Sequence, residues 1–154
     1  MAGRIEQRLA DLGITLPTPA VPIANYVPFT MSGSLLVVSG QIPLRDGAVA
    51  YAGKVGVEVG IEDAKAAARL CFVNLLAQVK AATGDLDRVT RVLRLGGFIA
   101  APAAFTQHAA VMNGASDLAV EVFGDAGRHA RSTIGVPSLP ADAAVEVEGM
   151  FEIG

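Results

Sequence analysis

The sequence contains only one cysteine, no tryptophan and two histidines. A single cysteine cannot form an internal disulfide, nor can it build a metal cluster. Because Cys71 lies between Leu70 and Phe72, we expect a buried thiol rather than a catalytic one. His108 and His129 lie far apart in the sequence, so no metal site is expected.

Charge is scarce as well, and no run of lysine or arginine occurs. Charged residues make up 18% of the chain and the formal net charge is −3. Proteins that bind nucleic acid through its phosphates are usually basic, so no nucleic-acid partner is expected. The first residues carry mixed charges, from Arg4 to Asp11, which does not fit a signal peptide.

Two long stretches, residues 12–44 and 95–116, contain no charged residue. Prolines interrupt the first, and glycines, a proline and polar side chains interrupt the second. Neither fits a membrane-spanning helix, so we expect no membrane association and a cytoplasmic location. Hydrophobic residues nevertheless make up 52% of the sequence. Since so apolar a chain has little polar surface, we expect other subunits to cover part of it.

A chain of 154 residues is long enough for one domain with a buried core. Residues 1–19 are predicted to form an N-terminal helix and an extended tether, because Ile5 and Leu9 have helical spacing and prolines follow. Residues 20–154 are predicted to form a single domain. It begins with an edge strand at 23–31, which contains Tyr26.

The middle of the chain predicts a buried strand and a long helix. The apolar run Leu35–Val38 is typical of a strand buried on both faces. It ends abruptly in Ser39-Gly40-Gln41, which is either a bulge or strand end, or a ligand site. After a tight turn at Asp46-Gly47, apolar residues recur at helical spacing over 61–83, so a long helix is expected there.

A strand over 86–99 and a helix over 103–112 follow, with a break at Asn113-Gly114 and a further helical piece that ends at Phe123. The order of elements predicts an α+β fold in which two main helices pack on one face of a mixed sheet. The open face would expose leucine and valine side chains. A closed cyclic oligomer is therefore expected.

The last quarter of the chain predicts two strands separated by a proline-bounded loop. Arg131 opens the first of them. In the second, Val145 and Val147 alternate with Glu146 and Glu148, so the two carboxylates share one face. We expect these strands to be neighbours, which would place the arginine beside the carboxylates and hold a small anion and a water together.

The motifs resemble, in their order, the Rid (YjgF) family of reactive-intermediate deaminases, formerly described as L-PSP endoribonucleases. The resemblance extends over roughly residues 25–152 and rests on Leu36-Val37-Val38-Ser39-Gly40-Gln41-Ile42-Pro43, Ala130-Arg131-Ser132-Thr133-Ile134-Gly135-Val136, Leu139-Pro140 and Val145-Glu146-Val147-Glu148. It implies a chorismate-mutase-like α+β fold and a homotrimer with ligand clefts at the subunit interfaces. It also implies hydrolysis of 2-imino or enamine acids, of the 2-aminoacrylate kind, to 2-keto acids and ammonia.

The same resemblance assigns roles to individual residues. The family's arginine for the substrate carboxylate falls on Arg131, and its glutamate near the reactive carbon falls on Glu146. The serine of the Ser-Gly-Gln motif falls on Ser39, and the aromatic residue of the cleft falls on Tyr26. Residues 1–19 are an addition to the pattern of shorter members and could cover or reshape the cleft.

The chemistry expected of these residues is simple. An arginine binds a carboxylate through two parallel hydrogen bonds, which would orient the imine carbon toward water. Glu146 could then take a proton from that water or return one to the leaving nitrogen. Backbone groups near Gly40 and Thr133 are candidates for binding the nitrogen. No metal or organic cofactor is implied, because such imines already hydrolyse slowly in water.

Other interpretations stay open at this point. Arg131 could pair with Glu146 or Glu148 across adjacent strands as a surface ion pair. Alternation alone does not distinguish the two glutamates, and Tyr26 could simply pack on an edge strand. The function could also be non-catalytic, with a regulatory trimer that binds a small carboxylate. Ribonuclease activity fits the low charge least well.

Overall fold

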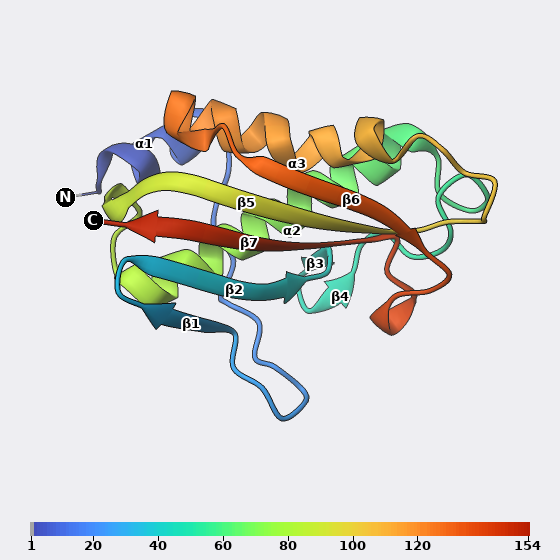
Figure 1. Ribbon diagram of the computed structural model, residues 1–154, viewed down its shortest axis with the longest axis horizontal. Coiled ribbons are helices and arrows are strands. Elements are labelled where there is room, and N and C mark those ends of the chain that lie inside the picture. The colour runs from blue at the N-terminus through green and yellow to red at the C-terminus, as the bar shows by residue number, and fades with distance from the viewer. Residues whose placement is uncertain (1) are drawn as a thin grey trace.

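The computed structural model describes residues 2–154, so Met1 of the predicted 1–19 segment lies outside the described residues. A five-stranded sheet has the order β1-β2-β7-β5-β6, and only β5 and β6 are parallel. The two long helices cover one face of it (Figure 1). The strands are β1 (Phe29–Ser32), β2 (Leu35–Gln41), β5 (Val89–Ala100), β6 (Ala130–Val136) and β7 (Val145–Ile153), with β3 (Leu44–Arg45) and β4 (Ala48–Val49) forming a separate pair. The predicted α+β class with a mixed sheet and both main helices on one face is confirmed.

The predicted N-terminal helix is present as α1 (Arg4–Asp11). Its amides at Arg4 and Ile5 donate to the carboxylate of Asp87, at 2.8 and 2.7 Å, so a distant aspartate caps its positive end. Asp87 belongs to a short 3₁₀ turn, η1 (Leu86–Arg88), which occupies the start of the predicted 86–99 strand. Ile5 and Leu9 are buried in the same core as the rest of the chain, so α1 is part of the folded body.

The long helix α2 (Ile61–Thr83) begins and ends as predicted. Gly84 follows in the left-handed region, with φ of 76°, and ends the helix. The helix packs against the sheet and against α3 (His108–Phe123), and residues 71–79 in its C-terminal half are all buried. Burial raises the pKa of the Cys71 thiol well above its ordinary value, so the expected buried and unreactive thiol is confirmed.

The predicted break at Asn113-Gly114 is wrong, because α3 runs through it without interruption. The helix also begins later than predicted, since residues 103–107 form a loop. Gly114 faces the backbone of α2, where a Cβ atom would lie 2.8 Å from the carbonyl carbon of Lys65. The glycine therefore permits close helix packing, a cause that lies in a distant segment of the chain.

Two predictions about the strands also need correction. The predicted edge strand 23–31 is shortened to Phe29–Ser32, because the preceding residues form bends. The strands that carry Arg131 and Glu146 are not neighbours, since β5 lies between β6 and β7. The long β5 pairs with both of them, and the alternative of an Arg131 ion pair with Glu146 or Glu148 across adjacent strands of one chain is therefore excluded.

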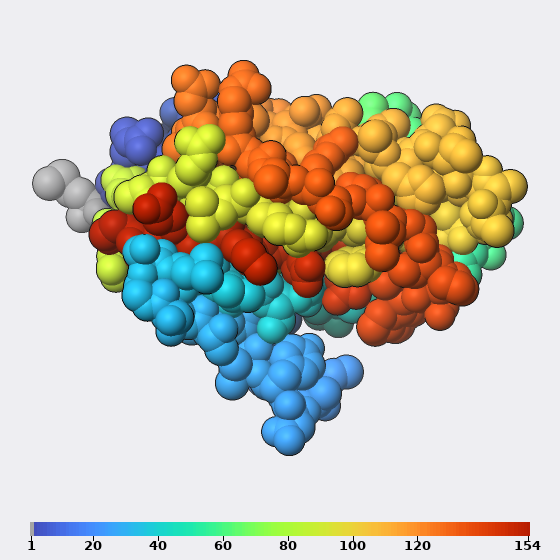
Figure 2. All heavy atoms as spheres, in the orientation of Figure 1, coloured from blue at the N-terminus to red at the C-terminus, as the bar shows by residue number. Residues whose placement is uncertain are grey.

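The strand Leu35–Gln41 is buried on one face only, as Leu36 and Val38 are buried while Leu35 is 37% exposed. The open face of the sheet, which Figure 2 shows in the same orientation as Figure 1, also exposes Leu93 and Ile134. The expectation of exposed leucine side chains on this face agrees with Leu35 and Leu93, whereas the expected exposed valines of the final strand, Val145 and Val147, are buried. No helix within residues 2–154 is long and apolar enough to cross a membrane.

Candidate functional site

The two glutamates of β7 lie on the open face of the sheet, as the alternation predicted. Val145 and Val147 are buried beneath them, on the helix-covered face. Glu148 forms an ion pair with Arg94 at 3.4 Å, whereas Glu146 has no ion pair within the described residues. Burial raises the pKa of Glu146, and the negative charge of Glu148 raises it further. Of the two carboxyl groups, Glu146 is thus the one without an ion pair and with the raised pKa.

Gly40 lies directly against the side chain of Glu146. The pairing of β2 with β7 shifts its register between Val38 and Gln41, which is the position of a bulge. A Cβ atom at Gly40 would lie 3.0 Å from Cδ of Glu146 and still closer to its Oε1. The bulge predicted as one interpretation of Ser-Gly-Gln is therefore present, and it leaves the carboxylate room beside the backbone.

Glu146 opens into a hollow of about 350 Å³, here named the Glu146 hollow. Tyr26 and Gly40 line it together with Gln41, Ile42 and Pro140. The segment Ala20–Ala24 forms another wall, held in place by Gln78, whose Nε2 donates to the carbonyl of Ala20 at 2.8 Å. This wall belongs to the predicted domain 20–154. None of residues 2–19 lines the hollow, so the N-terminal addition does not shape it within one chain.

Ser39 lies beside the hollow without lining it. Its hydroxyl donates to the carbonyl oxygen of Val27 at 2.8 Å, and its amide donates to the carbonyl oxygen of Pro28. Both acceptors follow Tyr26 closely in the chain. Ser39 therefore holds the segment that carries the tyrosine.

Arg131 and Thr133 lie in a different part of the chain's surface, on the edge strand β6. The side chain of Arg131 reaches helix α3, where Nη1 donates to Asn113 Oδ1 at 2.8 Å and to Ser116 Oγ at 3.0 Å. Thr133 follows on the same face of the strand, and its Oγ1 is buried with no hydrogen-bond partner within residues 2–154. Glu146 is on the opposite face of the sheet. One chain therefore does not bring Arg131 and Glu146 together.

His129 belongs to the surroundings of Arg131. Its Nδ1 lies 2.6 Å from the carbonyl oxygen of Gly127, and its Nε2 lies 2.8 Å from Ser116 Oγ. Burial lowers the pKa of the imidazole, and the charge of Arg131 lowers it further. The ring is therefore neutral near pH 7 and hydrogen-bonded at both nitrogens.

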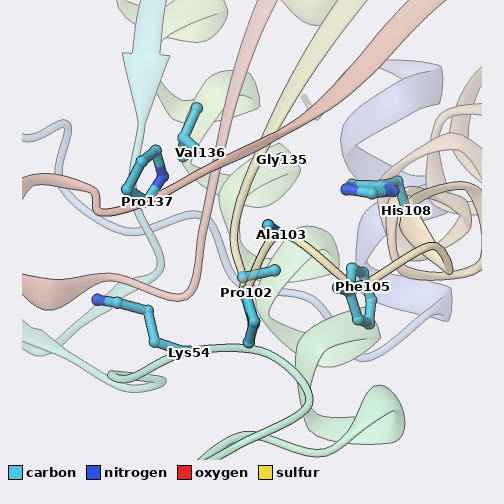
Figure 3. Close-up of a pocket in the computed structure, with 9 residues that line it drawn as sticks. Lys54, Pro102, Ala103, Phe105, His108, Gly135, Val136 and Pro137 are labelled. Carbon is cyan, nitrogen blue, oxygen red and sulfur yellow. The ribbon is translucent and has the colours of Figure 1, made fainter.

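A second hollow, of about 600 Å³, lies where β6 ends and α3 begins, and Figure 3 shows its lining. Lys54 and His108 contribute its nitrogen-bearing side chains, and prolines, Phe105 and Val136 contribute apolar walls. Lys54 is already paired with Asp142 at 3.1 Å. The rings of Phe105 and His108 pack edge to face. The sequence analysis did not predict this hollow, because its lining comes from three segments that are distant in the chain, around residues 54, 101–108 and 135–137.

A comparison with known protein families agrees with this geometry. The family described as "YjgF/chorismate_mutase-like, putative endoribonuclease" matches residues 6–152. The chain belongs to the YjgF/chorismate mutase-like family. Membership accounts for the order of the Ser-Gly-Gln, Ala-Arg-Ser-Thr and Val-Glu-Val-Glu motifs, and the predicted resemblance is confirmed.

Individual YjgF-family relatives are similar over nearly their whole length. The protein TCP17 of Trypanosoma cruzi is 45% identical over 153 residues, which cover 99% of this chain and 96% of TCP17. The crystal structure of Atu1372 from Agrobacterium tumefaciens, described as of unknown function, is 51% identical with a TM-score of 0.92, over 97% of this chain and 92% of that one. A "putative endoribonuclease" from Shewanella oneidensis is 36% identical with a TM-score of 0.95, over 98% of this chain and 100% of that one. The α+β, chorismate-mutase-like fold is therefore shared in detail.

Proposed function

We propose that this protein is a hydrolytic deaminase that converts 2-imino and enamine acids, such as 2-aminoacrylate, to 2-keto acids and ammonia. The observation that supports this most strongly is the position of Glu146. Its carboxyl group is half-buried and free of an ion pair, its pKa is raised, and it opens into a hollow that also contains Tyr26 and Gly40. A carboxyl group with a raised pKa suits the exchange of protons with water near neutral pH.

The proposed reaction acts on the protonated imine, C=NH₂⁺, and requires a water molecule and three proton transfers. Glu146 takes a proton from water while the water oxygen bonds to the imine carbon, and the electron pair of the C=N double bond moves to nitrogen, which gives a neutral carbinolamine. Glu146 then returns its proton to that nitrogen. The C–N bond breaks with its electron pair on the departing ammonia, the hydroxyl oxygen forms the carbonyl, and the hydroxyl proton passes back to Glu146. An enamine acid enters this route after its β-carbon has taken a proton. Such hydrolysis needs no organic cofactor or metal, because the chain's own groups supply the acid and the base.

Arg131 is proposed to bind the substrate carboxylate, and the backbone near Thr133 and Gly40 to bind the nitrogen. Arginine presents two parallel N–H donors to a carboxylate, which would fix the distance between the imine carbon and Glu146. Within the described residues no aspartate or glutamate pairs with Arg131, whose partners are all neutral. A guanidinium with neutral partners only is suited to an anionic ligand.

The opposite positions of Arg131 and Glu146 lead to the proposal of a homotrimer with one site at each subunit interface. The outer edge of β6 has no strand partner within residues 2–154, and Ile134 on this strand is 52% exposed. The segment around residues 20–28 projects from the body of the protein (Figure 2), and its Ile23 is fully exposed. Packing β6 of one subunit against this segment of the next would cover both apolar surfaces and bring Arg131 to the neighbour's Glu146.

The direct test measures keto-acid formation. A serine dehydratase generates 2-aminoacrylate from serine, and a coupled lactate dehydrogenase reports pyruvate as it forms. We expect the wild-type protein to accelerate pyruvate formation and the Arg131→Ala variant to lose that acceleration. The proposal is overturned if purified wild-type protein has no effect, or if Arg131→Ala is fully active. Saturable binding of a 2-keto acid without turnover of several imino acids would instead identify a regulatory carboxylate-binding protein.

Endoribonuclease activity is the second candidate, because the family description and the Shewanella oneidensis structure carry that word. RNA binding through phosphates normally depends on basic residues, whereas this chain has a formal net charge of −3. Incubation of the protein with labelled single-stranded RNA tests this. We expect no cleavage above that of the Glu146→Gln variant, and cleavage that Glu146→Gln abolishes would favour the nuclease.

A further inference from the structure

The guanidinium of Arg131 is held at one end by helix α3. Nη1 uses both of its hydrogens, one to Asn113 Oδ1 at 2.8 Å and one to Ser116 Oγ at 3.0 Å. Nη2 has a longer contact with the carbonyl oxygen of Ala109, at 3.4 Å. All three acceptors lie on successive turns of the same helix, so this end of the side chain is fixed by a rigid element.

This arrangement leaves one particular edge of the guanidinium available. The five N–H groups lie in one plane, and the Nε hydrogen and one Nη2 hydrogen form the edge away from Nη1. Within residues 2–154 Nε of Arg131 donates to no acceptor, and Nη2 has only the long contact with Ala109 at 3.4 Å. The Nε–Nη2 edge is therefore the one left to donate two parallel hydrogen bonds to a carboxylate.

His129 determines the direction of the hydrogen bonds around Ser116. The carbonyl oxygen of Gly127 can only accept, so His129 Nδ1 carries a hydrogen and donates it across 2.6 Å. The neutral ring then has a lone pair on Nε2, which accepts the hydroxyl hydrogen of Ser116 across 2.8 Å. The Ser116 oxygen consequently turns its lone pairs toward Arg131. Three hydrogen bonds thus connect Gly127, His129, Ser116 and Arg131 in that order, and each has one donor and one acceptor.

We propose that Ser116 and His129 are positioning residues for substrate binding: they hold the Nη1 end of Arg131 on α3, so that its Nε–Nη2 edge faces the carboxylate of a 2-imino or 2-keto acid. This inference rests on the proposed function, in which Arg131 is the carboxylate anchor. Neither residue touches the substrate. Without them the arginine samples several rotamers in the unbound protein, and binding must then restrict them.

The test compares paired substitutions that remove or restore one acceptor. Ser116→Ala removes the hydroxyl, whereas Ser116→Thr keeps it. His129→Leu removes the Nε2 lone pair, whereas the amide oxygen of His129→Gln can replace it. Isothermal titration calorimetry with 2-oxobutanoate gives the Kd, and the coupled dehydratase assay gives KM and kcat. Ser138→Ala and Ser34→Ala are controls, because they remove an exposed serine hydroxyl away from this network.

We expect Ser116→Ala and His129→Leu to raise Kd and KM about tenfold, the effect of losing one charge-assisted hydrogen bond, with kcat changed less than about twofold. Ser116→Thr, His129→Gln and both controls should remain close to wild type. If Ser116 and His129 only stabilised the fold, Ser116→Ala and His129→Leu would lower the folded fraction and hence kcat. Ser116→Thr and His129→Gln would then not restore KM independently of kcat. If His129→Leu fails to fold by circular dichroism, the two Ser116 variants decide.

Failure of this inference can be told apart from failure of the proposed function. If wild-type protein binds 2-oxobutanoate and accelerates the reaction while Ser116→Ala and His129→Leu match it, only the positioning role is overturned. If wild-type protein neither binds nor turns over, the deaminase proposal fails and the positioning role falls with it. Equal loss of kcat in all four variants also contradicts the positioning role.

Discussion

Gly40 and Glu146 lie so close together that no side chain fits between them: a Cβ atom on residue 40 would be 3.2 Å from Cγ of Glu146 and 3.0 Å from its Cδ. The clashing group is the far end of a flexible side chain, so the fold can accommodate an alanine by moving the glutamate. The glycine of the Ser-Gly-Gln motif thus determines where the carboxyl group lies.

Gly40→Ala should therefore separate activity from stability. We expect kcat to fall at least about tenfold, since general acid–base catalysis depends on the position of the catalytic group. The melting temperature should change by only a few degrees. Gly60→Ala is the control, because residue 60 has an ordinary φ and a Cβ there meets no atom within 4 Å. Unchanged kcat in Gly40→Ala would mean that Glu146 does not act from this position.

Substitution of the two glutamates of β7 should distinguish their roles. Glu146→Gln keeps the size of the side chain but removes the acid and base, so we expect kcat to fall by about 10²–10⁴-fold with KM little changed. Glu148→Gln loses only the ion pair with Arg94 and should retain most activity. Steady-state kinetics of both variants decide this. The reverse result would assign catalysis to Glu148.

The pH dependence of kcat/KM should reveal the raised pKa of Glu146. As a base, Glu146 acts only when ionised, so the rate should rise with pH through a midpoint above the ordinary pKa of a glutamate. Burial is the main cause of the shift and the charge of Glu148 is the second, so Glu148→Gln should move the midpoint toward lower pH. A midpoint that Glu148→Gln leaves unchanged, or moves upward, would contradict this electrostatic account.

The free energy of unfolding should also depend on pH through the raised pKa of Glu146. It should fall as the pH rises, whereas kcat/KM rises. A carboxyl group whose pKa is higher in the folded than in the unfolded state binds more protons when folded. Stability from Glu146 is thus fully present below the unfolded pKa and is lost as pH rises through the folded one. Glu146→Gln cannot titrate, so its melting temperature relative to wild type should increase with pH across that window. A difference that is constant with pH would show that the pKa is not raised.

Much of the fold follows from local patterns in the sequence. The apolar period over residues 61–83 and the stop at Gly84 predict α2 closely, because both depend on neighbouring residues only. The alternation of valine and glutamate in β7 predicts correctly which side chains are buried. These features need no knowledge of distant contacts.

What could not be predicted depends on contacts between distant segments. The continuity of α3 through Gly114 results from packing against the backbone of Lys65, whereas the sequence shows only two residues that commonly end helices. The insertion of β5 between β6 and β7 is a choice of strand pairing, and the register of the two pairs places Arg131 and Glu146 on opposite faces. The contact of Ser116 with His129 likewise joins a helix to the loop that precedes β6.

Each site is proposed to combine Arg131 of one subunit with Glu146 of another, and an experiment that mixes two inactive variants tests this arrangement. The variants Arg131→Ala and Glu146→Gln are each expected to be inactive, because every interface in either oligomer lacks one of the two groups. Unfolding an equal mixture in denaturant and refolding it together produces mixed oligomers. Light scattering of the product gives the oligomeric state, for which we expect a trimer.

In the mixed trimers a site is complete only when an Arg131→Ala chain supplies Glu146 and a Glu146→Gln chain supplies Arg131. With equal amounts and random assembly, each condition is met about half of the time, so about one quarter of the sites should be restored. We therefore predict that keto-acid formation recovers to about one quarter of that of wild-type protein refolded in the same way. Mixed oligomers that remain as inactive as the two separate variants would contradict a site shared between subunits.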